Sequence, residues 1–146
     1  MESARPVIHV VDDDDGVRTG LERLLRSSGW TTRTFATASS FLEETPPQTV
    51  GCIVLDINMP GMSGPELHEV LGAHGIDMPV LYLTGEGTVP TAVKAMKLGA
   101  LEYFEKPVDL DVLLVAVARA VEEHTRRRAA LGRRSELERR LGALSP

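Results

Sequence analysis

The chain has 146 residues, of which 42% are hydrophobic and 25% charged, and its formal net charge is −5. This length and composition fit one soluble domain with a hydrophobic core and exclude a chain that is disordered throughout. No segment has the apolar length of a membrane helix and the N-terminus lacks a signal-peptide pattern, so we expect no membrane association and a cytoplasmic location. The single cysteine, Cys52, cannot form an internal disulfide, and we expect a small buried side chain there.

Charge is distributed unevenly along the chain. Residues 1–118 carry 17 acids and 8 bases, a net charge of −9, whereas residues 119–146 carry 4 acids and 8 arginines, a net charge of +4. A basic tail can indicate binding to nucleic acid. A solvated arginine-rich helix or linker explains the same composition more simply, and we favour that interpretation.

Apolar, partly β-branched runs alternate with segments of helical periodicity. We expect strands at residues 7–11, 31–36, 52–55, 80–83 and 101–104. A helix should follow each strand, and the last should begin near Asp109 or Asp111. The short second helix is expected to be capped by Thr37 or Ser40, the latter with Glu43 at a capping-box spacing. Five strands alternating with five helices predict an α/β fold, a doubly wound five-stranded parallel sheet with an extended C-terminal helix.

Polar side chains follow four of the five predicted strands. An acidic run at residues 12–15 follows the first strand, Asp56 the third, Thr84 the fourth and Lys106 the fifth. Taken singly, an acid at a strand end is usually a helix cap, a threonine a turn residue and a lysine a solvated charge. Because the carboxyl ends of parallel strands meet at one edge of a sheet, where such folds bind ligands, we expect these side chains to converge.

The converging groups suit phosphoryl transfer. A carboxylate can accept a phosphoryl group as a covalent intermediate, but its oxygens repel the incoming phosphate unless a hard cation neutralises them. Asp12, Asp13 and Asp56 offer oxygens of the kind that Mg²⁺ or Mn²⁺ prefers. Lys106 supplies a positive charge and Thr84 a hydroxyl donor for phosphoryl oxygens. We therefore expect Asp56 to be the phosphoacceptor, with Thr84 and Lys106 binding the phosphoryl group.

Four motifs resemble the response-regulator receiver domain. They are Val-Asp-Asp after the first strand, Leu-Asp-x-x-Met-Pro-Gly-Met-Ser-Gly after the third, Thr-Gly after the fourth and Lys-Pro after the fifth, within about residues 5–122. The resemblance implies a flavodoxin-like receiver fold and a signalling switch that is not an enzyme acting on metabolites. It implies that a sensor histidine kinase phosphorylates Asp56. It also implies that Asp13, Asp56 and the carbonyl of Asn58 bind Mg²⁺, with Asp12 acting near the metal, partly through water.

The resemblance extends to switching and output. Thr84 and Tyr103 match the pair that rearranges on phosphorylation, and the Lys106–Pro107 bond is expected to be cis as in the family, although base rates favour trans. Residues 84–100 and Glu-Lys-Pro resemble FixJ-type (LuxR-type) transcriptional regulators, which implies a homodimer on phosphorylation and regulation of transcription. Glu86 stands where His is frequent in that group, and Tyr103 where Phe is, departures that bear on switching and phosphoryl lifetime.

The remaining part of the chain, residues 123–146, is expected to be a helical linker, after a receiver domain at residues 1–122. Gly132 costs about 1 kcal/mol relative to Ala in a helix, which favours a partly frayed linker helix over a long coiled coil. Residues 144–146, Leu-Ser-Pro, resemble the opening of the helix-turn-helix domain of FixJ-type regulators. We therefore expect DNA binding only through an output domain absent from this chain. The alternative is a natural single-domain receiver with a solubilising tail.

Two other classes of protein fit less well. A haloacid-dehalogenase-like phosphatase also uses an aspartyl phosphate, Mg²⁺, Thr and Lys, but it requires Asp-x-Asp on the first strand, whereas Asp56 is followed by Asn58 on the third. A dinucleotide-binding domain requires Gly-x-Gly-x-x-Gly after the first strand, which this sequence lacks. His9 has no His or Cys at metal-ligand spacing, so we expect a side chain at a strand edge and not a ligand.

Overall fold

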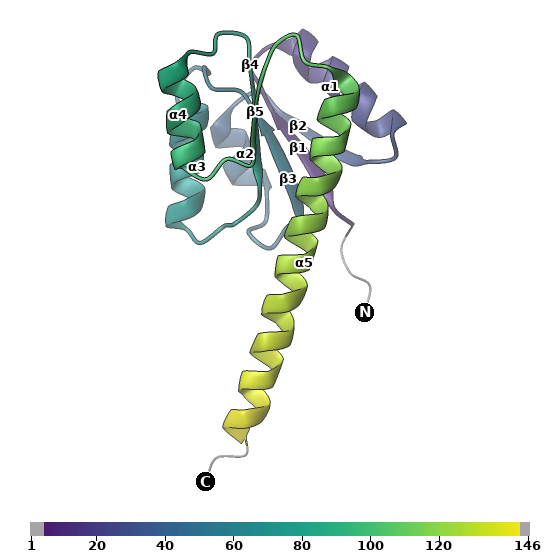
Figure 1. Cartoon of the computed structure of the whole chain (residues 1–146), viewed down its shortest axis with the longest axis vertical. Helices are drawn as coiled ribbons and strands as arrows, with labels where there is room; N and C mark the ends of the chain where they lie inside the picture. The colour runs from purple at the N-terminus through teal and green to yellow at the C-terminus, as the bar shows by residue number, and fades with distance from the viewer. Residues whose placement is uncertain (1–4, 144–146) are drawn as a thin grey trace.

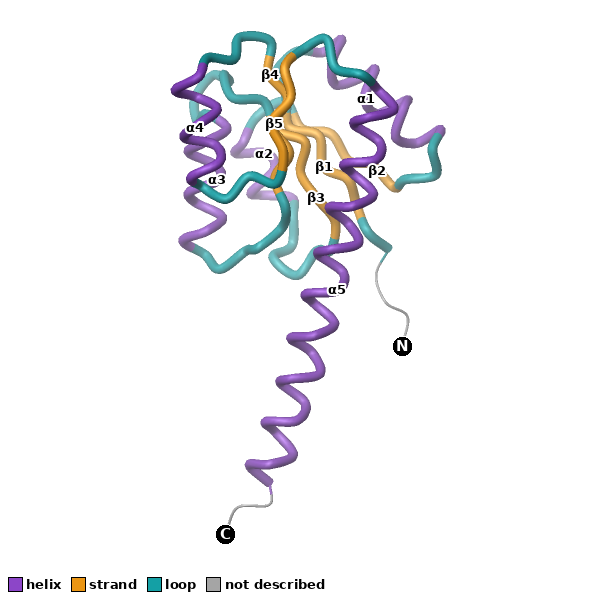
Figure 2. The backbone as a smooth tube through the Cα atoms, in the orientation of Figure 1, coloured by secondary structure: helices purple, strands orange, loops and turns teal. Residues whose placement is uncertain are grey.

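The computed structural model describes residues 5–143, which form one parallel sheet with helices on both faces (Figures 1 and 2). The strands are β1 (Val7–Val11), β2 (Thr31–Phe35), β3 (Gly51–Leu55), β4 (Val80–Thr84) and β5 (Glu102–Glu105). The helices are α1 (Asp15–Ser27), α2 (Ala38–Glu44), α3 (Gly64–Ala73), α4 (Val89–Lys97) and α5 (Leu110–Ala143). The strand order β2-β1-β3-β4-β5 confirms the predicted doubly wound α/β fold and places β3 at its centre.

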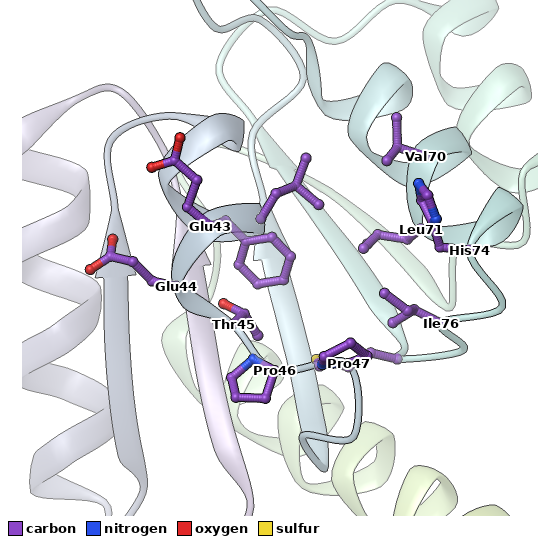
Figure 3. A pocket seen from close by; sticks show the side chains of 12 residues that line it. Glu43, Glu44, Thr45, Pro46, Pro47, Val70, Leu71, His74 and Ile76 are labelled. Atoms are coloured by element: carbon purple, nitrogen blue, oxygen red, sulfur yellow. The ribbon is translucent and has the colours of Figure 1, made fainter.

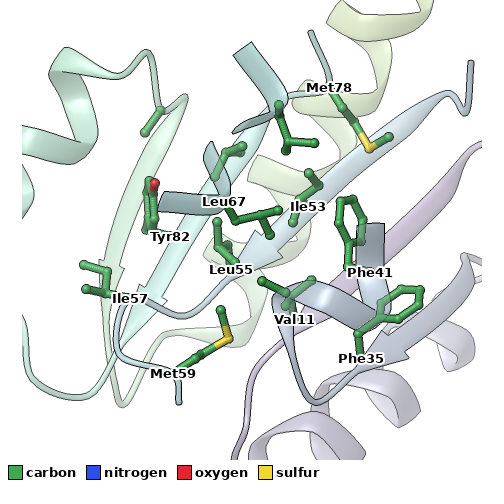
Figure 4. Packing of buried hydrophobic residues seen from close by; sticks show 14 of the residues in the cluster. Val11, Phe35, Phe41, Ile53, Leu55, Ile57, Met59, Leu67, Met78 and Tyr82 are labelled. Carbon is green, nitrogen blue, oxygen red and sulfur yellow. The ribbon is translucent and has the colours of Figure 1, made fainter. Parts of the chain in front are cut away.

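The sheet has a hydrophobic cluster on each face, and β3 contributes to both. All five residues of β3 are buried, because strands pair along both of its edges and helices cover both faces. Ile53 and Leu55 belong to the cluster that includes residues of α2 and α3 (Figure 4), whereas Cys52 and Val54 belong to the one that includes α1 and α5. Successive strand residues point to opposite faces, which explains this division. Cys52 is a free buried thiol, as predicted.

The starts of α2 and α3 agree only in part with our expectations. Thr37, one of the two predicted caps, is confirmed as the cap of α2, because its side chain accepts a hydrogen bond from the Ser40 N–H at 3.1 Å. The predicted Ser40–Glu43 capping box is wrong, since Ser40 already lies within the helix. A capping box that we did not predict starts α3, where the side chains of Ser63 and Glu66 each accept a hydrogen bond from the other's backbone N–H. This box fixes the start of α3 after the loop that leaves β3.

His9 is buried within the sheet, and our prediction of a strand-edge position is wrong. Its side chain is 1% exposed, and its Nδ1 donates a hydrogen bond to the Cys52 carbonyl oxygen at 3.1 Å. The ring packs against Phe35 and Phe41, which come from β2 and α2. Burial lowers the pKa of His9 to about 4, so the ring is neutral near pH 7.

Helix α5 has 34 residues and extends far beyond the sheet (Figure 1). The predicted helical extension is confirmed as far as Ala143, and the helix passes through Gly132 without a break. It also crosses residue 122 without interruption, so our domain boundary there stays a prediction. The motif at residues 144–146 that resembles a helix-turn-helix opening lies outside the described residues. Within residues 5–143, no helix combines the length and the apolar character needed to span a bilayer.

His124 holds α5 at the point where the helix leaves the sheet. The ring is 1% exposed; the Gly51 N–H donates to its Nδ1 at 3.1 Å, and its Nε2 donates to Asp77 Oδ1 at 3.1 Å. Burial lowers the pKa of His124, in keeping with the neutral tautomer that these two bonds require. Gly51 is the first residue of β3, the strand that leads to Asp56. The root of the extension is therefore bonded to the far end of the central strand.

Candidate functional site

The predicted site residues converge at the carboxyl edge of the sheet. Asp12 directly follows β1, Asp56 follows β3, Thr84 is the last residue of β4 and Lys106 follows β5. Backbone hydrogen bonds continue the strand ladder into the site: the Asp56 N–H donates to the Val11 carbonyl at 3.0 Å, and the Lys106 N–H to the Thr84 carbonyl at 2.8 Å. These backbone bonds therefore fix the positions of the Cα atoms from which the side chains of the site project.

Three carboxylates form the centre of the site. Oxygens of Asp12, Asp13 and Asp56 lie within 4.8 Å of one another. Asp12 and Asp56 are only 2% and 8% exposed, whereas Asp13 is exposed to solvent. Asp12 Oδ2 accepts a hydrogen bond from Lys106 Nζ at 3.0 Å, and Asp56 Oδ1 accepts one from the Ile57 N–H at 2.8 Å. Asp56 Oδ2 accepts no hydrogen bond from residues 5–143, which leaves this oxygen available for a ligand.

The four consecutive acids have three different roles. Asp12 and Asp13 belong to the carboxylate cluster, whereas Asp14 caps α1 by accepting a hydrogen bond from the Val17 N–H at 3.0 Å. This bond lowers the pKa of the Asp14 carboxyl. Asp15 lies in the first turn of α1 and pairs with Arg18, which also donates to the Asp12 carbonyl at 2.8 Å. Our sequence reasoning missed the contact from Arg18, although its helical spacing from Asp15 was visible.

The electrostatics of the cluster favour a bound cation. Burial raises the pKa of the Asp56 carboxyl to about 6, and the charge of Asp12 adds to this effect, while Lys106 opposes it. Buried carboxylates that repel one another fit a hard divalent ion, which Asp12, Asp13 and Asp56 would hold through their oxygens. Asn58 is exposed in the loop after Asp56, and its carbonyl stays a predicted ligand. Such an ion would supply positive charge beside the Asp56 carboxylate.

The raised pKa predicts a pH-dependent stability of the metal-free protein. Because the folded state binds the Asp56 proton more tightly than the unfolded chain, with its usual value of 3.8, this contribution to stability is full below that value and is lost as the pH rises through about 6. The loss corresponds to about 2–3 kcal/mol. In urea denaturation with a chelator, we expect Asp56→Asn to exceed wild type in stability by this amount at about pH 7.5, and by much less at about pH 4.5. An equal difference at both pH values contradicts the raised pKa.

Thr84 and Tyr103 have separate hydrogen-bond partners in the segment that follows β4. The Thr84 hydroxyl, which is buried, accepts a hydrogen bond from the Glu86 N–H at 3.3 Å. The Tyr103 hydroxyl lies 3.1 Å from the hydroxyl of Thr91 in the first turn of α4. A Cβ at Gly87 would lie 2.5 Å from the Tyr103 hydroxyl, so only glycine fits there with Tyr103 in this position. The sequence did not reveal the contact with Thr91, because the two hydroxyls belong to different elements.

The fold and the arrangement of the site together define a receiver domain. The Lys106–Pro107 peptide bond is cis, as the resemblance implied. Residues 8–118 match the family profile of the response regulator receiver domain. The chain therefore belongs to this family.

Known relatives agree with this assignment. The chain is 44% identical over 138 residues to the transcriptional regulatory protein FixJ of Azorhizobium caulinodans, covering 94% of this chain and 65% of FixJ. It is 37% identical over 145 residues to the response regulator protein TodT of Pseudomonas putida, covering 99% of this chain and 64% of TodT. The solved structure of the response regulator StyR superposes with a TM-score of 0.92 at 44% identity, covering 97% of this chain and 72% of that one. The chain thus spans slightly less than two-thirds of the two curated relatives.

Proposed function

We propose that this chain is a phosphorylation-activated switch of a two-component system, which accepts a phosphoryl group on Asp56 from a sensor histidine kinase in the presence of Mg²⁺. The observation that carries the proposal is the placement of Asp56 at the end of the central strand, beside two further carboxylates, where its Oδ2 accepts no hydrogen bond from residues 5–143. Intact mass after incubation with a small phosphodonor, with and without Mg²⁺, tests it. We expect a single phosphoryl mass gain that depends on the metal.

The transfer step uses groups that the site already presents. Asp56 Oδ2 forms a bond to phosphorus while the bond from phosphorus to the donor histidine nitrogen breaks, and its electron pair stays with that nitrogen. Lys106 Nζ, which donates to Asp12 Oδ2 at 3.0 Å in this structure, is proposed to bind one phosphoryl oxygen. The Thr84 hydroxyl is proposed to bind another. Both donors are strand-end residues, so the acceptor oxygen and its partners are held in one place.

Switching is proposed to couple Thr84 to Tyr103. When Thr84 turns toward the phosphoryl oxygens, its hydroxyl leaves the β4–α4 loop, where it now accepts the bond from Glu86. We propose that Tyr103 then turns inward and gives up its contact with Thr91. A shift of this kind needs only a small free-energy gap between two states, which the phosphoryl contacts bias. The contact between β5 and α4 is the part of the fold that changes.

The face made by α4, β5 and α5 is the proposed dimer surface. Apolar side chains on its two helices are about half exposed or more, namely Val89, Val93, Met96, Val112 and Val115. We expect Mg²⁺ with beryllofluoride, a phosphoryl mimic, to add a contact through this face and so to raise the association state of the chain in sedimentation velocity. Asp56→Asn is the matched control and should not respond to the mimic. An association state that is the same with and without the mimic contradicts this proposal.

The output of the switch is proposed to be the control of a transcription-regulating DNA-binding domain. Support comes from FixJ, a transcriptional regulatory protein of which this chain matches 65%. Residues 5–143 contain the receiver and the extension of α5 and no element after that helix. DNA binding is therefore proposed only for a chain that carries a further domain.

A further inference from the structure

A groove between α2 and α3 plays no part in the proposed function. It has a volume of about 670 Å³ and lies between the C-terminal half of α2, the loop at residues 45–47 and the C-terminal half of α3 (Figure 3). Buried apolar side chains, including Phe41, Leu71 and Met78, line it. Glu43 and Glu44 stand on its α2 side and are exposed. None of the described residues that line the groove is a lysine or an arginine.

The groove also contains an unpaired polar group. The hydroxyl of Thr45, a lining residue, is buried and has no hydrogen-bond partner within residues 5–143. The hydroxyl oxygen has almost no exposed surface, so the match to an occupant comes from the other lining residues. Apolar side chains suit the floor of the groove, and cationic groups suit Glu43 and Glu44.

The distal part of α5 has the complementary character. The α5 extension, residues 125–143, carries seven arginines and two glutamates. Leu137 and Leu141 are each 57% exposed, and helical spacing places them with Ala130 on one stripe. Arg133 and Arg134 border this stripe on either side. An apolar stripe with cationic borders thus faces solvent in a chain that also presents an apolar groove with an acidic rim.

Pairing of two extensions with each other fits this pattern poorly. In a coiled coil, Ala130 and Leu137 would occupy one of the two core positions of the heptad and Leu141 the other. Arg134 and Arg127 would then occupy the same core position as Leu141 in the two preceding heptads. Like charges would oppose each other along the seam, whereas the α2–α3 groove offers opposite charge.

Because α5 is straight, its extension cannot reach the α2–α3 groove of the same chain. Met78 lines the groove, and the neighbouring Asp77 accepts hydrogen bonds from His124 (3.1 Å) and from Arg127 (3.3 Å) at the root of the extension. From this root the extension continues for about 28 Å as an unbroken helix that leads away from the sheet (Figure 1). The stripe of one chain therefore cannot reach its own groove, and the groove that it could meet belongs to another copy.

We propose that the α2–α3 groove docks the α5 extension of a second copy of this chain. The apolar stripe of α5 would lie on the apolar floor of the groove. The arginines that border the stripe would pair with Glu43 and Glu44. A two-fold axis makes the contact reciprocal, so each copy supplies one extension and one groove. This contact uses the face opposite to α5 and does not depend on phosphorylation, which separates it from the dimer of the α4–β5–α5 face.

A charge-swap experiment on the full chain tests the proposal. Sedimentation equilibrium without phosphodonor or Mg²⁺ would compare wild type with a groove variant, Glu43→Arg with Glu44→Arg, and an extension variant, Arg133→Glu with Arg134→Glu. Each variant alone should weaken self-association at least tenfold, because like charges then face each other in both contacts. An equimolar mixture should regain association, since both contacts of the mixed dimer again join opposite charges.

The groove substitutions should leave the fold intact, because both acids are exposed and arginine near a helix C-terminus is favourable. Circular dichroism checks this for every variant. A matched double reversal on the α4–β5–α5 face, Glu102→Arg with Asp111→Arg, should not change association. Three results would overturn the proposal. The wild type could stay monomeric, the extension variant could lose association while the groove variant keeps it, or the mixture of the two variants could fail to associate.

Discussion

Asp56→Asn is expected to abolish phosphorylation of this protein. Asn keeps the size of the side chain and one carbonyl oxygen, but it lacks the anionic Oδ2 that must form the bond to phosphorus. Incubation with acetyl phosphate and Mg²⁺, followed by intact mass spectrometry, should give a single phosphoryl adduct on wild type and none on the variant. Because the substitution also removes the repulsion among Asp12, Asp13 and Asp56, the fold should be retained.

The matched control is Asp111→Asn, which removes the same charge from an exposed position in the first turn of α5. This variant should be phosphorylated at the wild-type rate. Phosphorylation of Asp56→Asn to the wild-type level would sink the assignment, and an adduct mapped to Asp12 or Asp13 would move it to another carboxylate.

Asp13→Ala is expected to have the largest effect on metal binding. The exposed Asp13 carboxylate lies in the cluster with Asp12 and Asp56, and it forms no hydrogen bond within residues 5–143 that would otherwise explain its position. Loss of a direct ligand should reduce Mg²⁺ affinity by more than the roughly 10–100-fold that loss of an outer-shell partner costs. Isothermal titration calorimetry, or Mn²⁺ binding by electron paramagnetic resonance, measures this change.

Asp15→Ala removes an equal charge two residues away, where the side chain pairs with Arg18 and not with the cluster. Its Mg²⁺ affinity should stay close to that of wild type. If Asp13→Ala binds the ion as tightly as wild type, Asp12 or Asp14 must take its place in the ligand set.

The sequence predicted the convergence of these side chains because the fold brings strand ends together. Asp56, Thr84 and Lys106 could be placed at one edge from their positions after apolar runs, without knowledge of any side-chain contact. The sequence did not indicate which acids of the run at residues 12–15 join the carboxylate cluster and which one caps α1. A cap is set by backbone dihedral angles, and Asp13 and Asp14 are the same type of residue. The predicted Mg²⁺ ligands, including the Asn58 carbonyl, remain predictions.

Long-range contacts were beyond sequence reasoning. His9 was misplaced because the rings that bury it belong to β2 and α2, which local periodicity cannot relate to β1. The two partners of His124 lie 73 and 47 residues earlier in the chain. The α2–α3 groove likewise forms only when two helices pack side by side, so no sequence motif predicts it.

The unbroken α5 also has a mechanical consequence. The helix is anchored through His124 and continues without a break to Ala143. A domain joined to its end would therefore have a fixed orientation about the helix axis relative to the edge of the sheet that carries Asp56. Each inserted residue turns such a cargo by about 100° and advances it by about 1.5 Å. The response of a chimeric sensor built on this receiver should therefore rise and fall with the number of inserted residues, with a period of about 3.6. Inserts of seven residues, close to two full turns, should restore the signal that shorter inserts disturb.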